Sequence, residues 1–99
     1  MAKYRLSNEA KEDLIRIHQY GVKKFGLTQA DKYFDSFFEC FDIIARQPFS
    51  FESVDYIKKG YRRCVCGVDS IYYRINNDTI EIMAIIGRQD LNDIISSTL

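Results

Sequence analysis

The most regular alternation of hydrophobic and polar positions lies in residues 68–86, where two apolar runs flank the turn-forming triplet Asn-Asn-Asp. Both runs are rich in β-branched and aromatic residues, so this stretch predicts a β-hairpin. With Asn77 and Asp78 as a two-residue loop, one face would pair Ile75 with Ile80, Tyr73 with Ile82 and Ile71 with Ala84. The other face would pair Arg74 with Glu81 and Tyr72 with Met83. A slip of one residue would mix the two faces, so this register is favoured.

Two longer stretches before the hairpin repeat apolar residues at helical spacing. The first predicts a helix over residues 8–25, with Ser7 as its N-cap and Gly26 at its end. The second predicts a helix over residues 29–46 that must end before Pro48. Its apolar stripe consists of Ala30, Tyr33, Phe34, Phe37, Phe38, Phe41, Ile44 and Ala45. Because the link between the helices is so short, we expect an antiparallel pair packed through the two stripes.

The remaining segments complete an α+β pattern. Residues 61–66 predict a strand between Gly60 and Gly67, residues 4–6 can form an edge strand, and residues 48–55 read as a loop. The order of elements predicts an N-terminal helical hairpin packed on a small antiparallel β-sheet. With 99 residues, we expect one domain over residues 1–99. After Gly87 the sequence contains one helical step, formed by Leu91, Ile94 and Ile95.

Composition narrows the class of protein. The formal net charge is zero, so the chain as a whole does not have the charge typical of a nucleic-acid-binding protein. No apolar run approaches the roughly 20 residues of a membrane span, and no signal peptide follows Met1, so we expect a cytoplasmic protein. Cys64 and Cys66 should share one face of a strand as buried, reduced thiols. With only one histidine, His18, we expect neither a metal site nor a cofactor.

Basic residues gather in one part of the sequence. Lys58, Lys59, Arg62 and Arg63 surround Tyr61, and Arg74 and Arg88 should lie near them if the third strand of the sheet neighbours the first. Guanidinium groups beside tyrosine suit phosphate, RNA bases or an acidic protein surface. The alternative is a solvated edge whose charges only protect a strand from pairing with other chains.

The residue types required for RNA cleavage are incomplete. A metal-independent nuclease needs a general base, a general acid and cations for the developing phosphorane charge. His18 should lie on the first helix, away from the sheet, and Tyr61, Tyr72 and Tyr73 could act only with strongly shifted pKa values. We expect Asp55 to cap a turn or to pair with Arg62 or Arg63 rather than to catalyse.

The order of several short motifs resembles the ParE branch of the ParE/RelE toxin superfamily. The matching positions are Tyr4, Leu6, Ser7, Ala10, Asp13 and Leu14; Tyr20, Phe25, Gly26, Gln29 and Ala30; Ala45 and Pro48; Asp55, Ile57 and Gly60 to Arg63; then Ile71 to Ile75 and Ile80 to Ile82. The resemblance runs from about Tyr4 to Arg88, and the family fold is a helical hairpin on a small antiparallel sheet.

The resemblance implies a toxin of a type II toxin–antitoxin system that binds DNA gyrase, blocks replication and is not an enzyme. It also implies neutralisation by a ParD-type antitoxin. An extended or helical peptide of that antitoxin should dock at the sheet edge or in a groove beside the helical hairpin, with an acidic stretch near Arg62 and Arg63. The basic rim, comprising Lys58, Lys59, Arg62, Arg63, Arg74 and Arg88, is the expected binding set.

Two other functions stay open. The RelE branch of the superfamily cleaves messenger RNA on the ribosome with basic and tyrosine residues, and a decayed toxin would only bind its antitoxin. One departure from the family bears on this choice. Many ParE-like chains have arginine and histidine in the last strand, where this sequence has Ala84 and Gly87. That difference concerns the identity of the target and the potency of the toxin.

Overall fold

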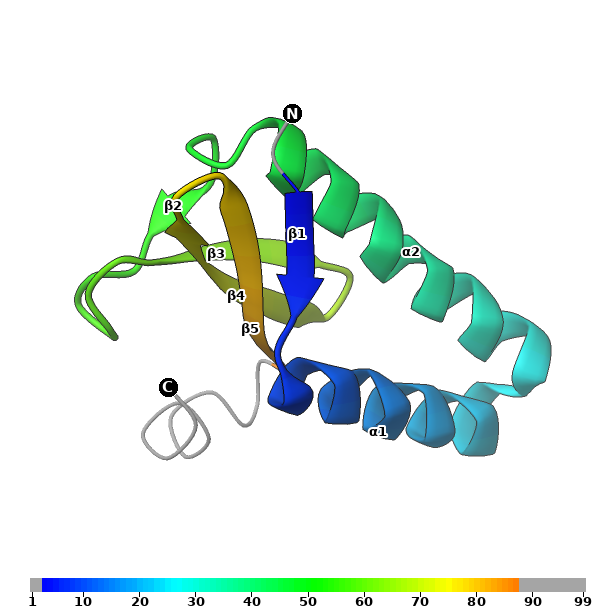
Figure 1. The fold of residues 1–99 in the computed structure, drawn as a ribbon. Coiled ribbons are helices and arrows are strands. Elements are labelled where there is room, and N and C mark those ends of the chain that lie inside the picture. Colours follow the sequence, from blue (N-terminus) through cyan, green and yellow to red (C-terminus); the bar gives the residue numbers. More distant parts are fainter. Residues whose placement is uncertain (1–2, 88–99) are drawn as a thin grey trace.

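The computed structural model describes residues 3–87. It contains two helices and a five-stranded sheet with strand order β1-β5-β4-β3-β2. The strands are β1 (Lys3–Leu6), β2 (Glu52–Ser53), β3 (Tyr61–Cys66), β4 (Asp69–Asn76) and β5 (Thr79–Gly87). The helices are α1 (Asn8–Phe25) and α2 (Leu27–Arg46), which form a V beside the sheet (Figure 1). The predicted α+β class with an N-terminal helical hairpin is confirmed.

The sheet is mixed rather than purely antiparallel. β1 pairs with β5 in parallel, with Tyr4 opposite Ile80, whereas the three other strand pairs are antiparallel. A parallel pair needs a long crossover connection, which the helices and the rest of the sheet supply here. Of the three strands predicted after the helices, the third was expected to neighbour the first. This expectation is wrong, because β4 lies between β3 and β5 and pairs with both.

The helical hairpin turns at a single glycine. Gly26 has a φ of 91°, and it serves both as the C-cap of α1 and as the N-cap of α2. This φ is open to glycine and costly for other residues. The turn therefore needs one residue, and α2 begins two residues earlier than predicted. At the other end of α1, Ser7 Oγ accepts the Ala10 N–H at 3.0 Å, as expected of an N-cap.

The β4–β5 hairpin has the predicted two-residue loop and, near it, the predicted register. Ile75 lies opposite Ile80, Tyr73 opposite Ile82, and Arg74 opposite Glu81. Further from the loop the register shifts at Tyr72 and Tyr73, so the predicted pairs of Ile71 with Ala84 and Tyr72 with Met83 are wrong. Met83 is the extra residue of a bulge, after which Tyr72 lies opposite Ala84 and Ile71 opposite Ile85. The bulge places the side chain of Ile85 in the core.

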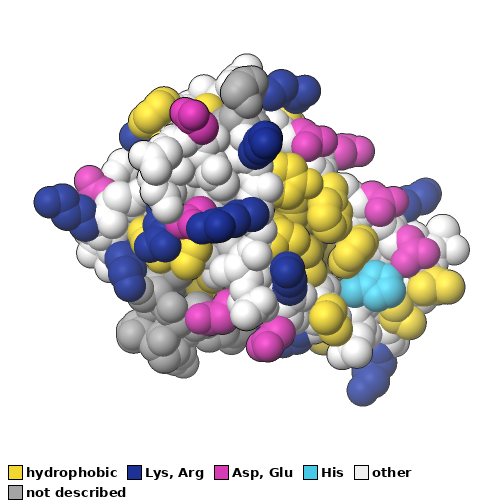
Figure 2. All heavy atoms as spheres, viewed as in Figure 1, with side chains coloured by type: hydrophobic (Ala, Val, Ile, Leu, Met, Phe, Trp, Pro, Cys, Tyr) yellow, Lys and Arg dark blue, Asp and Glu magenta, His cyan; other side chains and the backbone are white. Residues whose placement is uncertain are grey.

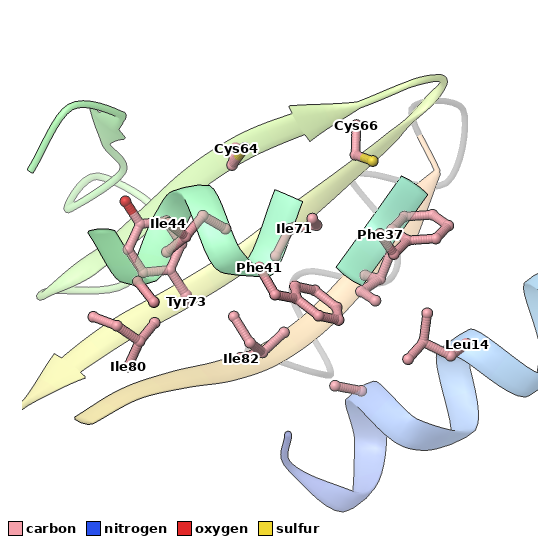
Figure 3. Packing of buried hydrophobic residues seen from close by; sticks show 13 residues of the cluster. Leu14, Phe37, Phe41, Ile44, Cys64, Cys66, Ile71, Tyr73, Ile80 and Ile82 are labelled. Atoms are coloured by element: carbon pink, nitrogen blue, oxygen red, sulfur yellow. The ribbon is translucent and has the colours of Figure 1, made fainter. Parts of the chain in front are cut away.

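Both faces of the sheet are covered. The main core lies between the sheet and the helices, where Phe37 and Phe41 of α2 meet the strand residues drawn in Figure 3. A second cluster lies on the opposite face; it consists of Val54, Tyr61, Tyr72, Ala84 and Ile86, with Ile57 and Met83 packed against it. Cys64 and Cys66 are buried in the main core as free thiols, as predicted.

Backbone and side-chain groups of the N-terminal region complete the edge of β5 where β1 ends. Ser7 N donates to the Ile82 carbonyl at 2.9 Å, and Ser7 Oγ donates to the Met83 carbonyl at 2.9 Å. Asp13 Oδ2 accepts the Ile85 N–H at 2.9 Å. Because buried strand edges require partners for their polar groups, these contacts fix α1 against β5.

Candidate protein-binding surfaces

A groove of about 630 Å³ runs between the helical hairpin and the β3–β4 turn. Its walls include apolar side chains of α1 and α2, and Val68 stands at the turn. Tyr20, Phe25 and Val68 are 59%, 63% and 75% exposed, which is unusual for three large apolar residues lining one hollow. Figure 2 shows hydrophobic side chains gathered between the two helices, beside the histidine. An exposed apolar groove of this kind is typical of a protein-binding site.

A hydrogen-bonded tyrosine fixes the floor of the groove. The Tyr33 hydroxyl of α2 lies 2.7 Å from Asp69 Oδ2 and 3.0 Å from the Cys66 carbonyl, and it accepts the Val68 N–H at 3.1 Å. Burial and the neighbouring Asp69 carboxylate raise the pKa of Tyr33. The hydroxyl therefore remains protonated and connects α2 to the β3–β4 turn, and the two walls of the groove are held together.

The rim of the groove carries charge. Arg16 and Lys32 line it on the two helices, and His18 Nε2 lies 2.8 Å from Asp31 Oδ1 across the hairpin. The edge of the His18 ring also meets the Phe34 ring, with centroids 5.4 Å apart. His18 therefore links α1 to α2, which agrees with the expectation that it lies away from the sheet.

The predicted basic rim is divided between the two faces of the sheet. Consecutive residues of a strand point to opposite faces, and Arg62 and Arg63 occupy adjacent positions in β3. Arg62 Nη1 donates to the Phe51 carbonyl at 2.8 Å, and the Arg62 guanidinium lies 5.1 Å from the centroid of the Phe49 ring. Arg63 pairs with Glu52 at 3.2 Å. The two arginines therefore lie on opposite faces of the sheet and have different partners.

Arg74 belongs to an ion-pair cluster on the face opposite the helices. Its Nε donates to Glu81 Oε1 at 2.5 Å, and Arg5 of β1 binds the other carboxylate oxygen. The two hydrogen bonds lower the pKa of the Glu81 carboxyl to about 2. Arg5 was missed by sequence reasoning, because only the parallel pairing of β1 with β5 places it opposite Glu81.

The two lysines of the predicted set lie on the exposed loop before β3. Lys58 Nζ stands 5.8 Å from the centroid of the Tyr61 ring, a cation–π arrangement, and Lys59 is also exposed. Arg88 lies outside the described residues. Asp55 Oδ1 accepts the Gly60 N–H at 2.8 Å, so the expectation that Asp55 caps a turn is confirmed.

Within residues 3–87, groups suited to acid–base chemistry are not assembled around the arginines. Burial raises the pKa of Tyr72, and it raises the pKa of Tyr73 to about 12. Both shifts move the phenols further from neutrality. Within the same described residues, no three or more histidine, cysteine or acidic side chains form a group that could hold a metal ion. Neither of its two helices is both long and apolar enough to cross a bilayer.

Comparison with known proteins places these features in a family. The model of the family described as "ParE toxin of type II toxin-antitoxin system, parDE" matches residues 4–92. The chain is 33% identical to Toxin ParE1 of Caulobacter vibrioides over 92 residues, which is 93% of this chain and 94% of the relative. It is 27% identical to Toxin ParE1 of Mycobacterium tuberculosis over 86 residues, covering 86% of this chain and 88% of the relative.

Solved structures share the fold. One is described as the chromosomal ParDE TA system from P. aeruginosa; it has a TM-score of 0.78 and 19% identity, covering 88% of this chain and 96% of that one. Another is a copper-bound mutant toxin from Helicobacter pylori, with a TM-score of 0.62 and 16% identity, covering 92% of this chain and 99% of that one. The extent of the family match and the identity to Toxin ParE1 are decisive: this chain belongs to the ParE toxin family of type II toxin–antitoxin systems.

Proposed function

We propose that this protein is a cytoplasmic toxin that inhibits DNA gyrase by binding it, thereby blocking replication, and that a ParD-type antitoxin neutralises it. Membership of the ParE family supports both partners. The structural observation that carries the proposal is the exposed apolar groove beside the helical hairpin. A surface of this kind favours a protein partner, because covering exposed aromatic residues with another apolar surface lowers the free energy.

The groove suits an amphipathic helix of the antitoxin. Such a helix places apolar side chains at every third or fourth position into a hydrophobic groove. Tyr20, Phe25 and Val68 would meet that apolar face, and Arg16 and Lys32 on the walls favour acidic residues at its borders. The sheet edge remains a second place where an extended part of the same antitoxin can add as a strand.

A structural role rather than catalysis accounts best for these arginines. On the face opposite the helices, Glu81 accepts hydrogen bonds from Arg5 and Arg74, and Glu52 pairs with Arg63. A cleaving site needs such cations to be available for the phosphorane charge, together with a general acid and base. These guanidinium groups are instead used to hold strands together.

A supercoiling assay tests the proposed target. Purified gyrase is incubated with relaxed plasmid, ATP and increasing amounts of the toxin, with and without its antitoxin. We expect the toxin to inhibit supercoiling and to leave cleaved DNA, and the antitoxin to prevent both effects. Unchanged supercoiling without cleaved DNA would contradict the gyrase proposal.

The same protein preparation distinguishes the alternatives. New messenger-RNA cuts in a toe-printing assay with a translation extract, at unchanged supercoiling, would favour the endoribonuclease. Normal growth of cells expressing the toxin without antitoxin, in combination with a stable toxin–antitoxin complex, would favour the decayed toxin.

We also propose that the exposed lysines of the basic rim contact an acidic segment of the antitoxin or the target. Lys58 and Lys59 are the best probes, because both are exposed and changing them leaves the ion pairs of the sheet intact. The double variant Lys58→Glu/Lys59→Glu should weaken binding of the antitoxin or of the target, and more so at low salt than at high salt. Lys11→Glu/Arg46→Glu, at two exposed basic residues that belong neither to the rim nor to the groove, is the control. Equal effects of the two double variants would contradict a specific role for the rim.

A further inference from the structure

Three thiols meet where α2 packs on β3. Cys40 of α2 places its Sγ atom 2.9 Å from Cys66 Sγ at the end of β3. Cys64 shares the strand face with Cys66 and is buried in the same core. The Cys66 thiol also donates a weak hydrogen bond to the Ser36 carbonyl, at 3.7 Å. Two sulfur atoms this close, on elements 26 residues apart in sequence, need only a small movement to form a covalent bond.

We propose that Cys40 and Cys66 form a redox modification site, at which a small peroxide joins α2 to β3 through an intramolecular disulfide. Cys40 is half-buried whereas Cys64 and Cys66 are buried, so an oxidant that diffuses to the protein reaches Cys40 first. Cys66 then resolves the oxidised Cys40, because its sulfur is in direct contact.

The reaction with hydrogen peroxide balances in two steps. The Cys40 thiol loses its proton and its sulfur attacks one peroxide oxygen; the O–O bond breaks, and the leaving hydroxide takes up a proton to form water. The product is a sulfenic acid on Cys40. The Cys66 sulfur then attacks the sulfenic sulfur, the S–O bond breaks, and the hydroxyl group leaves with the Cys66 thiol proton as a second water. Two thiols are oxidised to one disulfide while the peroxide is reduced to two waters.

Burial sets the rate and the order of these steps. It raises the pKa of Cys40, and it raises the pKa of Cys66 to about 12. Because thiolates are the reactive species, oxidation of this pair proceeds more slowly than that of an exposed cysteine. The cross-link should therefore form slowly.

The cross-link would act directly beneath the groove. Ser36, one helical turn before Cys40, lines the groove, and the Cys66 carbonyl accepts a hydrogen bond from Tyr33 on its floor. A disulfide would hold these two walls together when the non-covalent contacts between them loosen. This consequence for antitoxin binding rests on the proposed function, whereas formation of the disulfide does not.

Peptide mapping of the purified wild-type protein is the test. The reduced protein is treated with hydrogen peroxide, remaining thiols are alkylated, and the digest is analysed by mass spectrometry. We expect the intact protein to lose the mass of two hydrogen atoms before alkylation. The digest should contain a peptide pair linked through Cys40 and Cys66, in which Cys64 is alkylated. Linkage of Cys40 to Cys64, over-oxidation of Cys40 without a cross-link, or no reaction would each overturn the proposal.

Cysteine variants test which thiols are linked, and melting curves test whether the link stabilises the fold. Cys64→Ser should keep the cross-link, and Cys40→Ser should abolish it. Oxidation should raise the melting temperature of the wild-type protein by about 10 °C, because the disulfide closes a loop of moderate length. A melting temperature that does not rise in a cross-linked sample would contradict the stabilising role.

Antitoxin titrations separate this inference from the proposed function. The oxidised toxin should bind the antitoxin at least as tightly as the reduced toxin, since a groove with fixed walls loses less freedom on binding. A several-fold loss of affinity on oxidation would contradict the coupling to the groove. Absence of antitoxin binding in both forms would instead contradict the proposed function and leave the mapped disulfide standing.

Discussion

Glu81 shows how the charge of one residue links three neighbouring strands of the sheet. Its carboxylate receives hydrogen bonds from Arg5 of β1 and Arg74 of β4, and these lower its pKa to about 2 in the folded protein. A carboxyl group whose pKa is lowered on folding contributes stability above its pKa in the unfolded chain. That contribution decreases as the pH falls through the range between about 4.5 and 2.

We therefore expect the folded protein to lose stability as the pH falls from 5 to 2, and the variant Glu81→Gln to lose less over the same range. The glutamine cannot ionise, so it removes the titration of this site and the attraction to both arginines. Urea unfolding at several pH values measures the difference. Parallel pH dependence of wild type and variant would show that Glu81 does not titrate as proposed.

Gly67 is required by a steric contact at the β3–β4 turn. Its φ is 63°, and a Cβ atom there would lie 2.5 Å from Cε1 of Tyr33. Gly60 has a φ of 85° but no heavy atom within 4 Å of such a Cβ. We expect Gly67→Ala to lower the free energy of unfolding by about 2–4 kcal/mol, from backbone strain plus the clash. Gly60→Ala should cost about 1–2 kcal/mol from strain alone. Equal losses in chemical denaturation would rule out the contact with Tyr33.

At the scale of elements, helix α2 holds the main core. The Phe41 ring is fully buried and packs against Tyr4 and Phe38, each with a centroid distance of 5.3 Å. We expect Phe41→Ala to lower the free energy of unfolding by about 3–5 kcal/mol through lost burial and a cavity. Phe49, which is 72% exposed, is the control, and Phe49→Ala should cost much less. Similar losses measured by urea unfolding would mean that the aromatic stripe is not the core.

The sequence predicts these elements well wherever local chemistry decides them. The helical stripes, the glycine between the helices and the Asn77-Asp78 loop each have a local signal that the structure confirms. The bulge at Met83 and the parallel pairing of β1 have none. Both depend on how the sheet packs against the helices and the second cluster, so pairwise alternation along one hairpin could not reveal them.

At the scale of the whole molecule, the binding surfaces were only partly predictable. The groove combines Tyr20 and Phe25 of the hairpin with Val68 of the β3–β4 turn, which the sequence separates by more than forty positions. A groove beside the hairpin was expected from the family resemblance, but its lining residues required the fold. The basic cluster was visible in the sequence, whereas its division between two faces followed from the alternation of β3 and from the partners of each arginine.

Binding of the antitoxin to groove variants tests the account most directly. Tyr20→Asp places a charge where the proposed helix docks, and Ile15→Asp places the same charge on α1 at a position of similar exposure that does not line the groove. Calorimetric titration of each folded variant with the purified antitoxin gives the affinities. The groove account predicts roughly 30-fold or greater weakening for Tyr20→Asp and little change for Ile15→Asp. Unchanged affinity of Tyr20→Asp, or equal weakening by both substitutions, would contradict it.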